Sequence, residues 1–238
     1  MNVTKQLPQV ILPLACLPDI EYFCWLFHAS GVLVEIQETY PKQTCRNRYS
    51  IETANGVLNL VVPVTKPDGN HTCTRDILLD HKSPWARIHW RTIESAYNKS
   101  PYFLYYREAF ESIFLAPPKL LVDFNLKVLE ACCGILKTDP GIILTEYYRK
   151  GYENAVDMRQ LIMHKRKTVH TWSVQEFEPY MQVFSDRHPF FPNLSIIDLI
   201  FNEGPSAAHY LYRHCPGNKP VKQPDIQSSH DGCSSVSS

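Results

Sequence analysis

The spacing of apolar and polar residues predicts a βαβ unit at the start of the chain. Gln9–Leu14 is an apolar run interrupted by Pro13, which is typical of a short buried strand. Asp19 is a suitable N-cap for a helix over Ile20–Ala29, and Gly31 follows as its stop. Val32–Glu38 alternates and then turns polar, which predicts a second strand. Such units bind ligands at the carboxyl ends of their strands.

A β-hairpin is predicted next. Tyr49–Thr53 alternates between apolar and polar residues, Asn55-Gly56 supplies a type I′ turn, and Val57–Val64 resumes an extended pattern. Asp76–Leu79 is a further candidate for a short strand.

From Pro84 onwards the pattern has a helical period. Trp85, His89, Ile93 and Tyr97 recur on one face, which predicts a helix that Pro101 ends. The remaining predicted elements are helices over Phe103–Phe114, Lys119–Lys137 and Ala207–Tyr212, a late strand over Ile142–Leu144, and a polar loop over residues 153–170.

One more helix is predicted to begin at Ser195. The stretch Ser195-Ile196-Ile197-Asp198 resembles a capping box, and Gly204-Pro205 closes the helix. Taken together, the elements predict an α/β fold with a βαβ-like N-terminal half, a hairpin and a helical C-terminal half. We expect one domain over residues 1–215 and a disordered tail over residues 216–238, which is rich in Pro, Ser, Lys and Gln.

Composition restricts the classes of function. The 24 basic and 24 acidic side chains give a net charge of zero, which argues against broad binding of nucleic acid or of an anionic membrane. No apolar run approaches the ~18 residues of a membrane span. None of the eight cysteines forms a CxxC pair, so we expect reduced thiols in a cytoplasmic protein. No zinc spacing is present, so no metal is predicted, and no cofactor is indicated.

The segment Lys42–Arg48 is the strongest candidate for a binding site. If it is extended, Lys42, Thr44, Arg46 and Arg48 share one face, and guanidinium groups suit phosphate or carboxylate. The alternative is a solvated basic loop. Cys45 would be a nucleophile if the neighbouring cations lowered its pKa.

Two further groups of residues are candidates. His89 and Tyr97 lie on the apolar helical stripe, where a histidine is either a general base or a core residue with a satisfied hydrogen bond. Asn193, Asp198 and Glu203 surround the late helix, where Asp198 is most economically read as a cap. Glu203 stands at a helix end that disfavours carboxylates.

An ordered series of motifs resembles the WbqC-like family of bacterial proteins, in the form common in Bacteroidetes. The matching pieces run from about residue 10 to about residue 212. They are Leu17–Phe23, Lys42–Arg48, Ala54–Gly56, Val62–Val64, Trp90–Tyr102, Asp123–Asn125, Asp157–Arg159 and Pro179–Gly204.

This resemblance implies a link to O-antigen or other surface-polysaccharide synthesis. Our hypothesis is a transferase that moves an acyl or aminoacyl group to an amino sugar and binds an anionic small molecule, either a nucleotide sugar or an acyl donor. In this hypothesis the substrate is bound by Tyr22, Lys42, Arg46, Asn47, Arg48 and Asn193. Protons are transferred by His89, Tyr97 or Glu203. The alternative is a non-catalytic binding or assembly protein of the same pathway.

Overall fold

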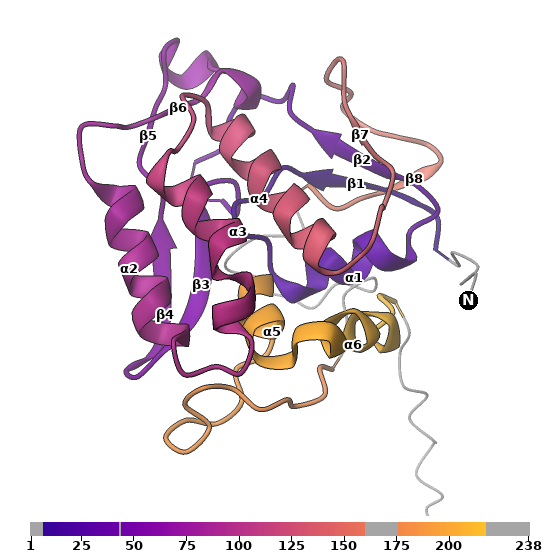
Figure 1. Ribbon diagram of the computed structural model, residues 1–238. Coiled ribbons are helices and arrows are strands. Elements are labelled where there is room, and N and C mark those ends of the chain that lie inside the picture. The colour runs from indigo at the N-terminus through magenta and orange to yellow at the C-terminus, as the bar shows by residue number, and fades with distance from the viewer. Residues whose placement is uncertain (1–6, 43, 160–175, 218–238) are drawn as a thin grey trace, which may run out of the picture.

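The fold is built on a four-stranded parallel sheet (Figure 1). The structure is a computed structural model that describes residues 7–42, 44–159 and 176–217. The strands lie in the order β7-β2-β1-β8. They are β1 (Gln9–Pro13), β2 (Val32–Glu35), β7 (Ile142–Leu144) and β8 (Ala155–Asp157). The predicted α/β class is confirmed.

The βαβ unit at the N-terminus forms as the sequence predicts. Helix α1 (Ile20–His28) joins β1 to β2, and the Asp19 carboxylate caps it by accepting a hydrogen bond from the backbone N–H of Tyr22 at 2.9 Å. Every residue of α1 is buried, which explains why its sequence is apolar nearly all round.

Strand β8 lies in a region that the sequence analysis assigned to a loop. It is only three residues long and has polar neighbours, so it lacks a periodic signal, yet it pairs with β1 in parallel. The chain therefore moves from β1 to one side for β2 and returns on the other side for β8. This reversal is a topological switch point, where open α/β sheets bind ligands at the carboxyl ends of their strands. Residues 160–170 of the predicted loop lie outside the described residues.

The predicted hairpin is present, but its turn differs. Strands β3 (Arg48–Thr53) and β4 (Gly56–Val61) pair antiparallel, with Thr53 opposite Gly56. A type I′ turn needs a positive φ at both central residues, and of the turn residues only Gly56 has one, at +94°. The predicted type I′ turn is therefore wrong. The other short elements are β5 (Val64–Thr65), β6 (Leu78–Leu79) and the 3₁₀ turns η1 (Gly69–His71) and η2 (Thr74–Asp76).

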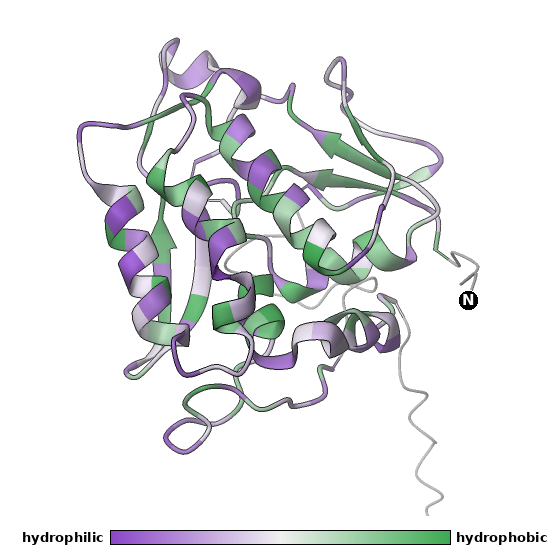
Figure 2. Ribbon diagram, viewed as in Figure 1, coloured by the Kyte–Doolittle hydropathy of each residue, from purple (hydrophilic) through white to green (hydrophobic). Residues whose placement is uncertain are grey.

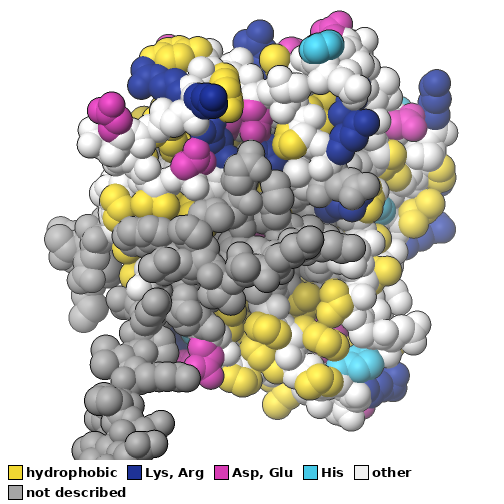
Figure 3. Space-filling view, turned by 180° about the vertical axis from the view of Figure 1, so that it is seen from behind, with side chains coloured by type: hydrophobic (Ala, Val, Ile, Leu, Met, Phe, Trp, Pro, Cys, Tyr) yellow, Lys and Arg dark blue, Asp and Glu magenta, His cyan; other side chains and the backbone are white. Residues whose placement is uncertain are grey.

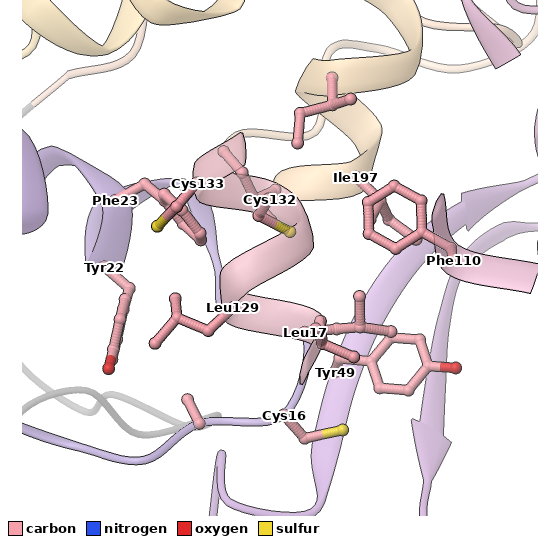
Figure 4. Close-up of a cluster of buried hydrophobic side chains, with 14 of the residues drawn as sticks. Cys16, Leu17, Tyr22, Phe23, Tyr49, Phe110, Leu129, Cys132, Cys133 and Ile197 are labelled. Atoms are coloured by element: carbon pink, nitrogen blue, oxygen red, sulfur yellow. The ribbon is translucent and has the colours of Figure 1, made fainter. Parts of the chain in front are cut away.

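Helices cover the sheet and the hairpin around one continuous core (Figure 1). They are α2 (Trp85–Tyr97), α3 (Phe103–Leu115), α4 (Leu121–Ile135), α5 (Ile196–Glu203), the turn η3 (Gly204–Ser206) and α6 (Ala207–Arg213). Hydrophobic residues line the strands of the sheet (Figure 2). Side chains from α1, α4, α5 and the loop after β1 meet in the core (Figure 4). Within the described residues, no helix has the length and apolar character that crossing a membrane requires.

Asp198 does not cap α5 as the sequence suggested. The Ser195 hydroxyl donates to the backbone oxygen of Leu17 at 2.9 Å instead of capping the helix. The Asp198 carboxylate accepts hydrogen bonds from Tyr97 at 2.8 Å, Tyr180 at 2.5 Å and Gln182 at 3.0 Å. It thus joins α2, α5 and the segment before α5, a non-local role that a short motif cannot reveal.

Gly204 ends α5 for a steric reason. Its φ is +52°, and a Cβ there would lie 2.5 Å from ring atoms of Tyr102. Both the backbone conformation and the close ring contact therefore require glycine.

Candidate functional site

The loops that follow β1 and β2 are held together at the carboxyl edge of the sheet. The backbone N–H of Cys16 donates to the oxygen of Cys45 at 2.8 Å. The Asn125 amide, from α4, donates to the oxygen of Arg46 at 2.8 Å and approaches that of Leu14 at 3.4 Å. One buried amide therefore fixes both loops at the carboxyl edge of the sheet.

The segment Lys42–Arg48 is curled rather than extended. Lys42 and residues 44–47 form bends and turns, and β3 begins at Arg48. Lys42 is exposed, whereas Thr44 and Arg46 are buried and Arg48 is half-buried. The predicted alternation, which placed these four side chains on one face, is therefore wrong.

Arg46 is fully buried and forms an ion pair with Glu38. Its Nε donates to Glu38 Oε1 at 2.7 Å, and Nη2 lies 2.5 Å from the same oxygen. Burial raises the pKa of Glu38, and the Arg46 charge opposes this rise. This pairing is the reason that the loop curls, since a buried guanidinium needs a counter-ion. Arg46 Nη1 has no hydrogen-bond partner among the described residues.

A second buried arginine follows β8. Arg159 lies 3.2 Å from Glu35 through Nη1 and donates to Asp157 through Nε at 2.9 Å. Glu35 also accepts from Thr145 at 2.8 Å. Arg159 is thus fully engaged and ties the carboxyl ends of β2 and β8 together. Among the described residues, Arg46 and Arg48 each keep a guanidinium nitrogen without a hydrogen bond.

A small pocket opens beside Arg48, between the loop after β1 and the start of β3. Its volume is about 120 Å³, which exceeds by several times the roughly 10–15 Å³ that one water needs. It can hold a group the size of a phosphate. We call it the β1–β3 pocket, and it is lined by Ala15, Cys16, Leu17, Pro18, Asp19, Cys45, Arg48, Tyr49, Ser50, Asn193 and Ser195.

Unpartnered polar atoms occur on Arg48, which lines the β1–β3 pocket, and on three residues close to its wall. Within the described ranges, the hydroxyls of Tyr22 and Tyr40, Arg46 Nη1 and Arg48 Nε are buried and make no hydrogen bond. The Tyr22 hydroxyl points away from Phe23 and from the packed core (Figure 4). Leaving such groups unpaired is costly, typically about 1–3 kcal/mol each. A group at this position that bonds to them would recover that cost.

The pKa values of Tyr22 and Tyr40 are affected by the charged groups near them, which shows that these phenols and cations lie close together. Burial raises the pKa of Tyr22, and Cys45, Arg46 and Asp19 lie close enough to modify it. Burial likewise raises the pKa of Tyr40, although the nearby positive charges of Arg46 and Arg48 act to lower it. Both phenols are therefore neutral donors, which suits recognition of an anion. Basic and acidic side chains lie near one another on the upper part of the face seen in Figure 3.

Asn193 contributes to the pocket through an uncommon backbone conformation. Its φ is +56°, and its Oδ1 accepts from the N–H of Glu21 at 2.8 Å while Nδ2 donates to Asp19 at 3.3 Å. Asn193 therefore helps to fix the start of α1 and also lines the pocket. Asn47 donates to the oxygen of Val62 at 2.8 Å, which anchors the curled loop to the residue that follows β4.

Cys45 lines the pocket but is not activated. Burial raises its pKa to about 11, although Arg46 acts in the opposite direction. Burial also raises the pKa of Cys16. A thiol in this state is protonated near neutral pH, so the neighbouring cations do not make Cys45 a nucleophile as the sequence suggested.

The three residues predicted to handle protons do not line the pocket. His89 is buried beneath β3, bonded to the Tyr49 hydroxyl at 3.0 Å, and burial lowers its pKa to about 4. Tyr97 is bonded to Asp198. Glu203 ends α5, roughly 12 Å from Ser195 at a rise of about 1.5 Å per residue. Their catalytic roles stay predictions.

Sequence reasoning missed several pocket residues. Cys16 and Asp19 follow β1, and Ser50 lies in β3. The signal that could have identified the residues after β1 was their position directly after a buried strand, because the carboxyl ends of parallel strands meet at one edge of the sheet. Within the described parts of the chain, no three His, Cys, Asp or Glu side chains are grouped to hold a metal ion.

The fold and the site define a parallel α/β protein with a small polar pocket beside the loop that follows β1. The chain belongs to the WbqC-like protein family, whose model matches residues 15–172. It is also similar to the uncharacterized protein Rv1507c of Mycobacterium tuberculosis, with 24% identity over 218 residues, which cover 82% of this chain and 92% of the relative. No solved structure matches the chain.

Proposed function

We propose that the protein is an enzyme of surface-polysaccharide precursor synthesis whose anionic substrate binds in the β1–β3 pocket. The observation that carries this proposal is the set of buried, unpartnered donors on Arg48, which lines that pocket, and on Tyr22, Tyr40 and Arg46, which lie close to residues of its wall. Two guanidinium groups and two neutral phenols favour a phosphate or a carboxylate. The position of the pocket beside the loop at the carboxyl end of β1 and the family membership support a substrate-binding role.

The reaction that we propose is transfer of an acyl or aminoacyl group to an amino sugar linked to a nucleotide. The sugar amine would attack the acyl carbonyl, lose a proton and release the leaving group of the donor. Arg46 and Arg48 would bind the phosphates, and Lys42, which is exposed, would meet the outer part of the substrate. Asn47 and Asn193 would hold the loops around it.

We expect Arg48→Ala to weaken binding of a uridine-diphosphate amino sugar about tenfold or more, since a hydrogen bond to a charged group contributes about 1.5–3 kcal/mol. Arg48 is half-buried and in no ion pair among the described residues, so folding should persist. Calorimetric titration measures the affinity. Arg75→Ala, which changes an exposed cation paired with Asp76, is the matched control and should bind normally. An Arg48→Ala variant that binds the nucleotide sugar as tightly as Arg75→Ala would refute the role of Arg48 in binding phosphate.

A non-catalytic binding protein is the second candidate. The observation that favours it is that Tyr22, Tyr40 and Cys45 all have raised pKa values, so none of them is a base near neutral pH. Mass spectrometry of the nucleotide sugar after incubation with an acyl donor discriminates the two. A mass gain of one acyl group that Arg48→Ala abolishes indicates a transferase, whereas binding without product indicates the binding protein.

A further inference from the structure

The loop between β7 and β8 carries a group of tyrosine and arginine side chains that lies outside the β1–β3 pocket. Residues 145–154, all of them described, form this loop without a helix or strand (Figure 1). The loop begins at the carboxyl edge of the sheet, where the N–H of Thr145 donates to the oxygen of Val34 at 3.0 Å. It is also held from the end of β8, because Arg159 Nη1 donates to the oxygen of Arg149 at 2.9 Å.

Five of these side chains stack alternately, ring on guanidinium. The Arg149 guanidinium lies 4.6 Å from the centre of the Tyr147 ring and 5.7 Å from that of the Tyr152 ring. The Arg159 guanidinium lies 5.6 Å from the centre of the Tyr152 ring and 5.2 Å from that of the Tyr148 ring. All four distances fall within the roughly 6 Å of a cation–π interaction. We call this series the Tyr–Arg ladder, which runs in the order Tyr147, Arg149, Tyr152, Arg159, Tyr148.

Arg159 fixes the ladder at the switch point of the sheet. This arginine follows β8, and its guanidinium lies 3.2 Å from the carboxylate of Glu35, which ends β2. β1 lies between β2 and β8 in the sheet, so the Arg159 side chain crosses the carboxyl end of β1. The chain reverses its direction across the sheet at this point, and open α/β sheets bind their ligands at such points.

The outer position of the ladder at this point is the ring of Tyr148. Tyr148 is 52% exposed, whereas the Arg159 side chain against one face of its ring is only 5% exposed. A ring that is covered on one face and half in water offers its other face to a flat ligand. The guanidinium also offsets the negative charge of the π face, which reduces the repulsion between two stacked rings. Tyr148 therefore suits a flat, electron-rich ring.

The charges of the loop show which part of a ligand the ladder selects. Arg149 and Lys150 are exposed cations, and Glu146 and Glu153 are exposed carboxylates, so the exposed charges of the loop sum to zero. This balance does not favour a polyanion. Stacking, in contrast, contributes to binding whatever the charge of the ligand, and nucleobases are flat rings that stack on aromatic side chains. The base of a nucleotide is therefore the group that the ladder fits.

We propose that the Tyr–Arg ladder binds a purine nucleotide, whose base stacks on the outer face of Tyr148 at the switch point. The two fused rings of a purine cover more of the tyrosine face than the single ring of a pyrimidine, so a purine gains more from stacking. No described residue of the ladder lines the β1–β3 pocket. The proposal is thus independent of that pocket and of the reaction proposed above.

Substitutions of Tyr148 separate the effect of its ring from that of its hydroxyl. Tyr148→Leu removes the aromatic face, and we expect adenosine diphosphate to bind about fivefold more weakly or worse, as for the loss of a stacking aromatic side chain. Tyr148→Phe keeps the ring and should bind adenosine diphosphate like the unaltered protein. Tyr105→Leu is the control, because it removes a tyrosine that is 79% exposed on α3, outside the ladder.

Calorimetric titration of the full chain measures these affinities, and circular dichroism confirms that each variant is folded. Weaker binding in Tyr148→Leu alone, with no binding of ribose 5-phosphate, which lacks the base, supports the proposal. An unaltered protein that does not bind adenosine diphosphate at millimolar concentration overturns it. So does a Tyr148→Leu variant that binds as tightly as Tyr105→Leu, or ribose 5-phosphate that binds as tightly as adenosine diphosphate.

Single-stranded nucleic acid is the other ligand that stacks its bases on aromatic rings. An oligoadenylate should bind no more tightly than adenosine diphosphate, because the exposed charges of the loop sum to zero. An oligoadenylate that binds about tenfold more tightly or better would identify nucleic acid as the ligand and would overturn the proposal.

Discussion

Replacing Arg46 with alanine should lower the free energy of unfolding by about 3–5 kcal/mol, because one partner of a buried ion pair is removed. Arg46 is fully buried, and Glu38 is 6% exposed. Glu38 would keep its buried carboxylate without a counter-ion. Urea denaturation measures the change. Arg75→Ala, which breaks an exposed pair with Asp76, should cost no more than about 1 kcal/mol.

The size of this loss should depend on pH in a defined direction. Burial already raises the pKa of Glu38, and Arg46 opposes that rise, so removing Arg46 raises the pKa further. A carboxyl whose folded pKa is raised favours the folded state when protonated, and this advantage disappears as pH rises through the folded pKa. Arg46→Ala should therefore be less destabilising in mild acid than in mild alkali. Adding Glu38→Gln should recover part of the loss, and an Arg46→Ala variant as stable as the unaltered protein would contradict the account.

Replacing Asp198 with alanine should cost a similar amount, about 3–5 kcal/mol, because a buried hydrogen-bond network loses its acceptor. The hydroxyls of Tyr97 and Tyr180 and the amide of Gln182 all donate to this carboxylate. Asp198→Asn keeps one acceptor oxygen and should lose less. Chemical denaturation of both variants gives the comparison.

The loss of stability in Ser195→Ala is the reference with which the loss in Asp198→Ala is compared. If Asp198 acted as a helix cap, its removal would cost about 1 kcal/mol, as for an ordinary cap. The Ser195 hydroxyl makes one hydrogen bond, to the oxygen of Leu17, so its loss should also be near that value. A loss for Asp198→Ala no larger than that for Ser195→Ala would show that the network contributes little.

Local signals in the sequence determined much of the fold. Asp19, followed by an apolar run and Gly31, predicted α1 almost to the residue, because capping and periodicity act within a few residues. The helical stripe ending at Tyr97 predicted α2 for the same reason. Strand β8 could not be predicted, since its three residues become a strand only by pairing with β1.

Some of the residues that the sequence singled out lie at the candidate pocket, while the shape of the loop that carries them could not be predicted. Arg48 and Asn193 line the pocket, and Tyr22 and Arg46 adjoin it. The curled loop was missed because its shape follows from the pairing of Arg46 with Glu38, eight residues away. The placement of His89 beneath β3 likewise depends on Tyr49, which lies on another element.

The most direct test of the pocket is a thermal unfolding titration of Tyr22→Phe with a uridine-diphosphate amino sugar. Tyr22 is fully buried, and its hydroxyl has no partner in the described part of the chain. Removing that oxygen should leave the melting temperature without ligand unchanged or higher, since an unpaired buried hydroxyl is costly.

The same substitution should reduce the rise in melting temperature that the ligand produces, because a donor to the bound anion is lost. The account predicts this combination of retained stability and weakened binding. A lower melting temperature without ligand, together with an unchanged ligand-induced rise, would contradict it.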